Sequence, residues 1–134
     1  MALFKELAKR STKAVGDEAE AKALAWLVQR GLVLVQRNYR VAAGPHARGG
    51  EIDLIMRERG AEGINTLVFI EVRARASAGQ GGAVASVTAT KRARIVRTAQ
   101  HYLLRWPQLP PCRFDVLTLQ GGQVEWLRGA FDAS

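Results

Sequence analysis

The sequence predicts an α/β fold, in which a central mixed β-sheet of about five strands is flanked by helices. The first observation is the order of the apolar patterns along the chain, which is helix, three strands, helix, two strands. The second is the helical pattern between the third and fourth strands, which is typical of a crossover between parallel strands. The third is size, because 134 residues, of which 48% are hydrophobic, suit one domain with its own core.

The first helix is predicted over 17–30, where apolar residues recur at helical spacing and Gly31 follows as a fitting end. Its apolar face is formed by Ala23, Leu24, Leu27 and Val28. Residues 1–15 are basic and lack a clear period, so they are predicted to form a loose N-terminal arm or a short helix that precedes a single domain over 16–134.

Five segments carry the apolar patterns of strands: 32–41, 51–56, 66–75, 113–119 and 123–127. The glycine pair at 121–122 predicts a two-residue hairpin between the last two of them. Glycine-rich stretches at 42–50 and 76–86 are predicted to be loops.

The second helix is predicted to follow the N-cap residue Thr88 and to run to about residue 106. Its apolar stripe is formed by Ile95, Ala99, Tyr102, Leu103 and Trp106. Lys91 lies in line with this stripe near the N-terminal end, and Arg92 lies close to it. Both are candidate nucleic-acid-binding residues, because a helix N-terminus with two cations suits a phosphate. A solvated basic face is the alternative.

The composition favours a polyanionic partner. Twenty Lys and Arg residues against twelve Asp and Glu give a net charge of +8, which is most simply explained by nucleic acid. The alternative is a basic protein with no such partner. Cys112 is the single cysteine, so an internal disulfide is excluded. The longest apolar run, 23–28, is far short of the roughly 20 residues of a membrane span, so we expect no membrane partner and a cytoplasmic location.

Two acids interrupt apolar strands, Asp53 in the second and Glu71 in the third. An ionised acid beneath helices is costly unless a cation or hydrogen bonds compensate for its burial. Two such acids on neighbouring strands repel each other, and Mg²⁺ or Mn²⁺ is a natural counter-charge for hard oxygen ligands. In the alternative interpretation Glu71 pairs with an arginine and Asp53 caps a turn.

Side-chain periodicity predicts where these acids point. Strand alternation places Asp53 on one face with Glu51 and Ile55. The opposite face of that strand is predicted to hold Ile52, Leu54 and Met56. On the first helix Glu20 lies in line with the apolar face, so it is directed towards the sheet. Glu20 is therefore a candidate third ligand or water-orienting group, and a partly buried glutamate bonded to backbone is the alternative.

The acids also form a motif. Asp53 followed by Glu71-Val72-Arg73 resembles the PD-(D/E)xK nuclease signature. Several segments across 16–131 together resemble the YraN-like family of small bacterial proteins: GDEAEAKALAWLVQRGL, RNYR, GGEIDLIMRERG, VFIEVRAR, GGAVASVTATK, CRFDVL and VEWLRGAF. That family is functionally uncharacterised, and it is similar to the restriction-endonuclease-like fold and to archaeal Holliday-junction resolvases. The resemblance implies that 16–134 form a single endonuclease-like domain.

The resemblance also implies roles for particular residues. Asp53 takes the place of the motif acid, Glu71 that of the glutamate in the Glu-x-Lys element, and Glu20 that of the acid on the first helix. Mg²⁺ or Mn²⁺ is then expected to be held by Asp53, Glu71 and the Val72 carbonyl.

The departure from the nuclease pattern is Arg73, which stands where the pattern has lysine. Arginine stays protonated, so it cannot be the base, although it can neutralise charge at the scissile phosphate. Proton removal would then rely on a metal-bound hydroxide or on Lys91, and a third alternative is that activity is lost while binding persists.

The predicted function is therefore metal-dependent hydrolysis of phosphodiester bonds in DNA, with branched and damaged DNA among the candidate substrates. The alternatives are a nucleic-acid-binding protein without cleavage and an interaction protein whose basic surface meets an acidic protein. A homodimer is an open alternative to a monomer.

Overall fold

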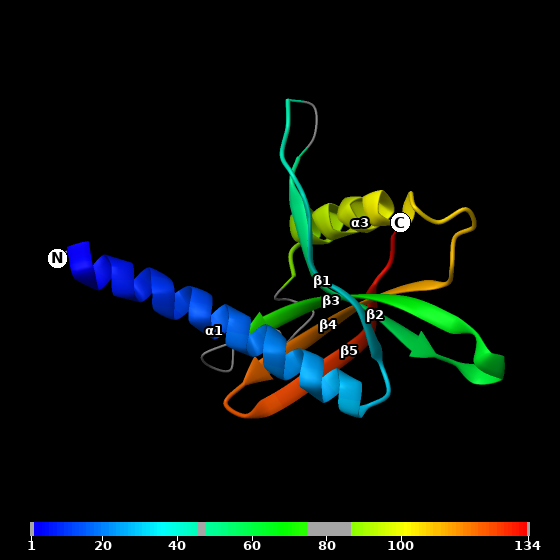
Figure 1. The fold of residues 1–134 in the computed structure, drawn as a ribbon, viewed down its shortest axis with the longest axis horizontal. Coiled ribbons are helices and arrows are strands. Elements are labelled where there is room, and N and C mark those ends of the chain that lie inside the picture. The colour runs from blue at the N-terminus through cyan, green and yellow to red at the C-terminus, as the bar shows by residue number, and fades with distance from the viewer. Residues whose placement is uncertain (1, 46–47, 75–86, 134) are drawn as a thin grey trace.

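The structure is a computed structural model that describes residues 2–45, 48–74 and 87–133. It has an α/β fold in which a five-stranded mixed sheet is flanked by two helices (Figure 1), as predicted, and this is consistent with a restriction-endonuclease-like fold. The elements are α1 (Ala2–Gln29), β1 (Val33–Val41), β2 (Gly50–Arg59), the 3₁₀ turn η1 (Ala61–Gly63), β3 (Asn65–Ala74), α3 (Ala89–Leu103), β4 (Cys112–Gln120) and β5 (Gln123–Phe131).

The strands lie in the sheet in the order β1-β2-β3-β4-β5. Neighbouring strands are antiparallel except for β3 and β4, which are parallel and are connected through the segment that contains α3. The predicted crossover is thereby confirmed. No helix in the described part of the chain is long and apolar enough to cross a membrane.

Each face of the sheet is covered by one helix. Against one face α1 packs a cluster that contains Ala23, Leu27, Leu54, Met56, Val68, Ile70 and Leu117. Against the other face α3 packs a cluster that contains Ile52, Ile55, Phe69, Ile95, Ala99, Tyr102 and Val116. The central strands are therefore buried on both sides, which explains their long apolar runs.

The ends of the helices differ in part from the prediction. The first helix begins at Ala2, so it includes the segment predicted as a loose arm or a short helix, and it ends before Gly31, whose φ is +94°. Val28, predicted on its apolar face, is half-exposed. Thr88 caps α3 as predicted, accepting a hydrogen bond from the Lys91 backbone N–H at 3.2 Å, whereas Trp106 lies beyond the end of the helix.

The predicted hairpin between β4 and β5 is confirmed, because Gly121 and Gly122 both have positive φ, +55° and +83°. Several strands are longer than predicted, and β2 already begins at Gly50, inside the stretch predicted as a loop. The second predicted loop, 76–86, lies outside the described residues.

The strands β2 and β3 separate at one end of the sheet. Their pairing runs from Arg59 opposite Asn65 to Leu54 opposite Ile70, and no pair follows among the residues described. The first part of β2 instead continues with β1 towards α3 (Figure 1).

The prediction that Ile52 shares a face with Leu54 and Met56 is wrong. Ile52 packs with Ile55 on the α3 side, while Leu54 packs on the α1 side. The position opposite Asp53 in the register between β1 and β2 is occupied by Asn38, whose φ is +51°. Strict alternation therefore fails across Asp53, at the position that faces this left-handed residue.

Candidate metal centre

The centre of the site is the point where β2 and β3 separate. One oxygen of Asp53, Oδ2, accepts a hydrogen bond from the backbone N–H of Val72 at 2.8 Å. In a continuing ladder that N–H would be available to the backbone of β2. The Asp53 carboxylate therefore satisfies a donor that the separation of the strands leaves free, and this contact fixes its orientation.

Two further acids meet Asp53 here. Glu20 reaches the opening from α1 and Glu51 from β2, and one oxygen of each lies within 4.8 Å of the others and of Asp53. Glu20 thus points towards the sheet, as its place on the helix predicts. Glu51 is a site residue that the sequence analysis does not single out.

The side-chain amide of Asn38 lies among these acids. Its nitrogen is 3.1 Å from Glu51 Oε1 and 3.1 Å from both carboxylate oxygens of Glu20, once the amide is oriented so that the nitrogen faces these acceptors. The same residue has the left-handed backbone described above. The sequence analysis does not single out Asn38, although it quotes the segment RNYR that contains it. The reason is that neither the backbone angle of Asn38 nor its contacts with Glu20 and Glu51 can be read from the sequence.

The fourth acid, Glu71 of β3, is buried, with 6% of its side chain exposed. Its Oε1 lies 3.3 Å from Lys91 Nζ and 3.7 Å from Arg73 Nη1. Arg73 comes from the same strand, whereas Lys91 reaches Glu71 from α3. One glutamate is thereby approached by two cations from different layers of the fold.

The charges in the site are unbalanced. The pKa of Asp53 is raised to about 7, chiefly by burial and then by the negative charges of Glu71 and Glu51, while the hydrogen bond from the Val72 N–H opposes the shift. Burial, followed by the charge of Asp53, also raises the pKa of Glu20. Desolvation and like charges thus disfavour ionisation of neighbouring carboxyls, and a divalent cation would relieve both effects.

Most of the predicted site residues come together: Glu20, Asp53, Glu71, Arg73 and Lys91. Arg92 takes a different direction, since its Nε donates to the Val87 carbonyl at 3.0 Å and its guanidinium carbon lies 5.8 Å from the centre of the Phe131 ring. Val72 contributes its N–H to Asp53, while the role of its carbonyl as a metal ligand stays a prediction.

The donor set fits Mg²⁺ or Mn²⁺, because both ions prefer carboxylate oxygens. The oxygens that already converge are those of Glu20, Glu51 and Asp53. Glu71, predicted as a ligand, lies beside Asp53 and influences its pKa, but its described ion pairs are with Lys91 and Arg73. The converging set is therefore wider than the pair of acids in the sequence motif.

In a comparison with known protein families, residues 19–119 match the model of the family described as "Uncharacterised protein family UPF0102". A UPF0102 protein of Methylibium petroleiphilum is 58% identical over 92% of this chain and 98% of its own length. A UPF0102 protein of an Acidovorax species is 54% identical over 93% of this chain and 89% of its own length. One from Cupriavidus taiwanensis is 49% identical over 99% of this chain and 94% of its own length. These names state no activity.

Proposed function

The chain belongs to the uncharacterised protein family UPF0102, the YraN-like family, and we propose that it is a divalent-metal-dependent nuclease that hydrolyses phosphodiester bonds in DNA. The observation that carries the proposal is the convergence of the Glu20, Glu51 and Asp53 carboxylates at the opening between β2 and β3, with Glu71 and its partner Lys91 beside them. Structural acids are normally matched by cations or hydrogen bonds, whereas burial and neighbouring negative charges raise the pKa of both Asp53 and Glu20.

The acids would hold the ion through Glu20, Glu51 and Asp53, with Glu71 beside them. A bound Mg²⁺ or Mn²⁺ supplies a Lewis acid for the phosphate and lowers the pKa of a coordinated water. The Val72 N–H keeps Asp53 turned into the opening, and Asn38 holds Glu20 and Glu51 together. The protein thus provides a preorganised set of oxygens on rigid elements.

The two cations at Glu71 can divide the remaining work. Arg73 stays protonated and would neutralise charge on the scissile phosphate. A lysine ammonium is a compact donor on a flexible stem, so Lys91 is the better candidate for orienting the attacking water. Its Nζ lies 3.3 Å from the same Glu71 oxygen that faces Arg73. Lys91 would therefore supply from α3 the lysine that the strand lacks.

The net charge of +8 supports a polyanionic substrate. A second candidate function is binding of nucleic acid without cleavage. It is favoured by the arginine at position 73, which removes the lysine of the nuclease motif from its usual place.

A cleavage assay tests the proposal. Branched, single-stranded and duplex DNA are incubated with the protein and Mn²⁺, Mg²⁺ or EDTA, and Glu20→Gln is compared with Glu18→Gln. Glu18 is a matched control because it lies on the same helix, is exposed and pairs with Lys22. Cleavage should require the metal, be lost in Glu20→Gln and persist in Glu18→Gln.

A second comparison separates the two basic residues. Lys91→Ala should abolish cleavage, whereas Arg73→Lys should retain or raise it, because lysine keeps the charge. Metal-independent binding without cleavage of any substrate would favour the second function.

A further inference from the structure

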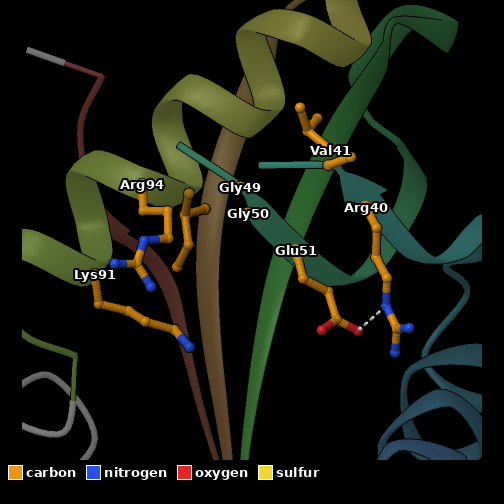
Figure 2. Close-up of a pocket in the computed structure, with 9 residues that line it drawn as sticks. Arg40, Val41, Gly49, Gly50, Glu51, Lys91 and Arg94 are labelled. Carbon is orange, nitrogen blue, oxygen red and sulfur yellow. Dashed lines mark ion pairs between the residues drawn. The ribbon is translucent and has the colours of Figure 1, made fainter. Parts of the chain in front are cut away.

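A pocket of about 570 Å³ lies beside the carboxylates, between the β1–β2 ribbon and the first turns of α3. Glu51 and Lys91 belong both to its wall and to the site described above. Figure 2 shows Lys91 and Arg94 on the α3 side of the pocket, with Glu51 and Arg40 across from them. The pocket is therefore a lateral extension of the carboxylate site.

The wall of the pocket is fixed by close packing at Gly50. A Cβ added to Gly50 would clash with Thr98 Oγ1 and would lie 3.3 Å from Arg94 Cγ. Only glycine lets the start of β2 approach α3 so closely. Thr98 is itself held, since its hydroxyl donates to the Arg94 carbonyl at 2.8 Å. The start of β2 is thus packed closely against α3 beside Arg94, whose guanidinium faces the pocket.

The cations of the pocket differ in whether they form ion pairs with acids. Arg40 Nε pairs with Glu51 at 3.3 Å, and Lys91 Nζ pairs with Glu71 at 3.3 Å. Arg94 is exposed and forms no ion pair with any residue that the structure describes. It lies three positions after Lys91, so both project from one side of α3. An uncommitted guanidinium beside an ammonium group favours an anion between or in front of them.

We propose that this pocket binds a phosphate of the DNA backbone next to the scissile phosphate, and that Arg94 is its principal contact. The inference rests on the proposed function, because it takes the carboxylate site as the place of cleavage. Arginine suits this task because its planar fork can bind two phosphate oxygens at once. The polynucleotide would then run from the carboxylates along the first turns of α3, and Arg94 would position it.

The test is DNA binding in EDTA, measured by fluorescence anisotropy over a series of KCl concentrations. Arg97→Ala is the matched control, because Arg97 is an exposed arginine of the same helix that lines a different pocket, beside Phe131. Arg94→Ala should weaken binding about tenfold and reduce the magnitude of the salt slope by about one. Arg94→Lys should keep the slope and lose part of the affinity, since lysine retains the charge without the fork.

Two results would overturn the proposal: Arg94→Ala with the affinity and slope of the wild type, or equal losses in Arg94→Ala and Arg97→Ala. A thermal melt of each variant verifies that the fold is kept. Binding in EDTA requires no cleavage, so its outcome decides the pocket even if the wild type proves inactive. If the wild type cleaves DNA, Arg94→Ala should raise KM more than it lowers kcat.

Discussion

The acids around Asp115 and those around Asp53 differ in how their negative charge is compensated. Asp115 of β4 is fully buried and accepts hydrogen bonds from Arg113 Nε at 2.8 Å and Nη2 at 2.9 Å, Trp126 Nε1 at 3.0 Å and the Gly129 N–H at 2.9 Å. Asp53 is surrounded by other acids, and it accepts a hydrogen bond from the backbone N–H of Val72. One aspartate has its charge balanced by its neighbours, and the other does not.

Glu58 extends the balanced cluster. It accepts hydrogen bonds from Arg113 at 2.7 Å and from Arg128 at 2.7 and 2.8 Å. Burial alone would raise the pKa of Glu58, but the hydrogen bonds from Arg113 and Arg128 lower it. Burial and like charges instead raise the pKa of Asp53 to about 7. The comparison teaches that this fold can neutralise a buried acid, so the imbalance at Asp53 has a reason other than stability.

The largest effect is expected from breaking the balanced cluster. Asp115→Ala should lower the free energy of unfolding by about 3–5 kcal/mol, because it leaves a partly buried arginine and two N–H donors without their acceptor. Urea denaturation measures the change, and Glu125→Ala, at an exposed position of β5, is the control. If Asp115→Ala lowered the free energy of unfolding no more than Glu125→Ala does, the hydrogen bonds around Asp115 would not stabilise the fold, and the contrast with Asp53 would fail.

Substitution of Asp53 is expected to raise the free energy of unfolding, whereas substitution of Asp115 lowers it. Its folded pKa is about 7 and its ordinary value is 3.8, so the stability it contributes is present below about pH 4 and is lost as the pH rises to about 7. Without metal, Asp53→Asn should therefore be more stable than wild type by about 2–4 kcal/mol at pH 8. Denaturation of both proteins between pH 4 and 8 measures the difference. Lower stability of Asp53→Asn throughout would assign the acid a structural role.

Divalent metal should reverse that ranking. An ion that binds only the folded protein stabilises it by about 2.7 kcal/mol at a concentration of 100 times Kd. Mn²⁺ should therefore raise the Tm of the wild type, but not that of Asp53→Asn combined with Glu71→Gln. Equal binding of Mn²⁺ by the wild type and the double variant, measured by calorimetry, would remove the metal site.

The smallest effect is expected at Asn38. Asn38→Ala should cost about 1–2 kcal/mol relative to Asn38→Gly, because alanine is strained at a φ of +51°. Both variants lose the amide beside Glu20 and Glu51, so both should bind Mn²⁺ more weakly than the wild type. Unchanged Mn²⁺ affinity in Asn38→Gly would restrict this residue to its backbone role.

Much of the fold could be predicted because its signals are local. The capping hydroxyl of Thr88, the glycine pair at 121–122 and the apolar runs of the central strands each depend on neighbours in sequence. The crossover between β3 and β4 followed from the order of the elements. The role of Asp115 could not be predicted in this way. Its negative charge is compensated by Trp126 and by Arg113, which also pairs with Glu58, a residue distant in sequence.

The candidate site was predicted in part. Asp53, Glu71 and Glu20 could be selected because each acid stands on an apolar strand or helix face. Strand alternation places Glu51 on the face of Asp53, but the approach of Glu51 to Glu20 depends on how α1 packs on the sheet, which alternation does not include. Adjacent helical positions point about 100° apart, so Lys91 and Arg92 could not both reach the acids.

The hydrogen bond from Val72 to Asp53 makes one amide proton a probe of the whole site. A backbone N–H bonded to a titrating carboxylate senses its charge, so the NMR resonance of the Val72 amide should shift with a midpoint near pH 7. Its exchange with solvent deuterium should report opening of this contact, since the ladder between β2 and β3 has already ended. The place where the sheet separates thus carries a spectroscopic marker within the backbone itself, with no added reporter group.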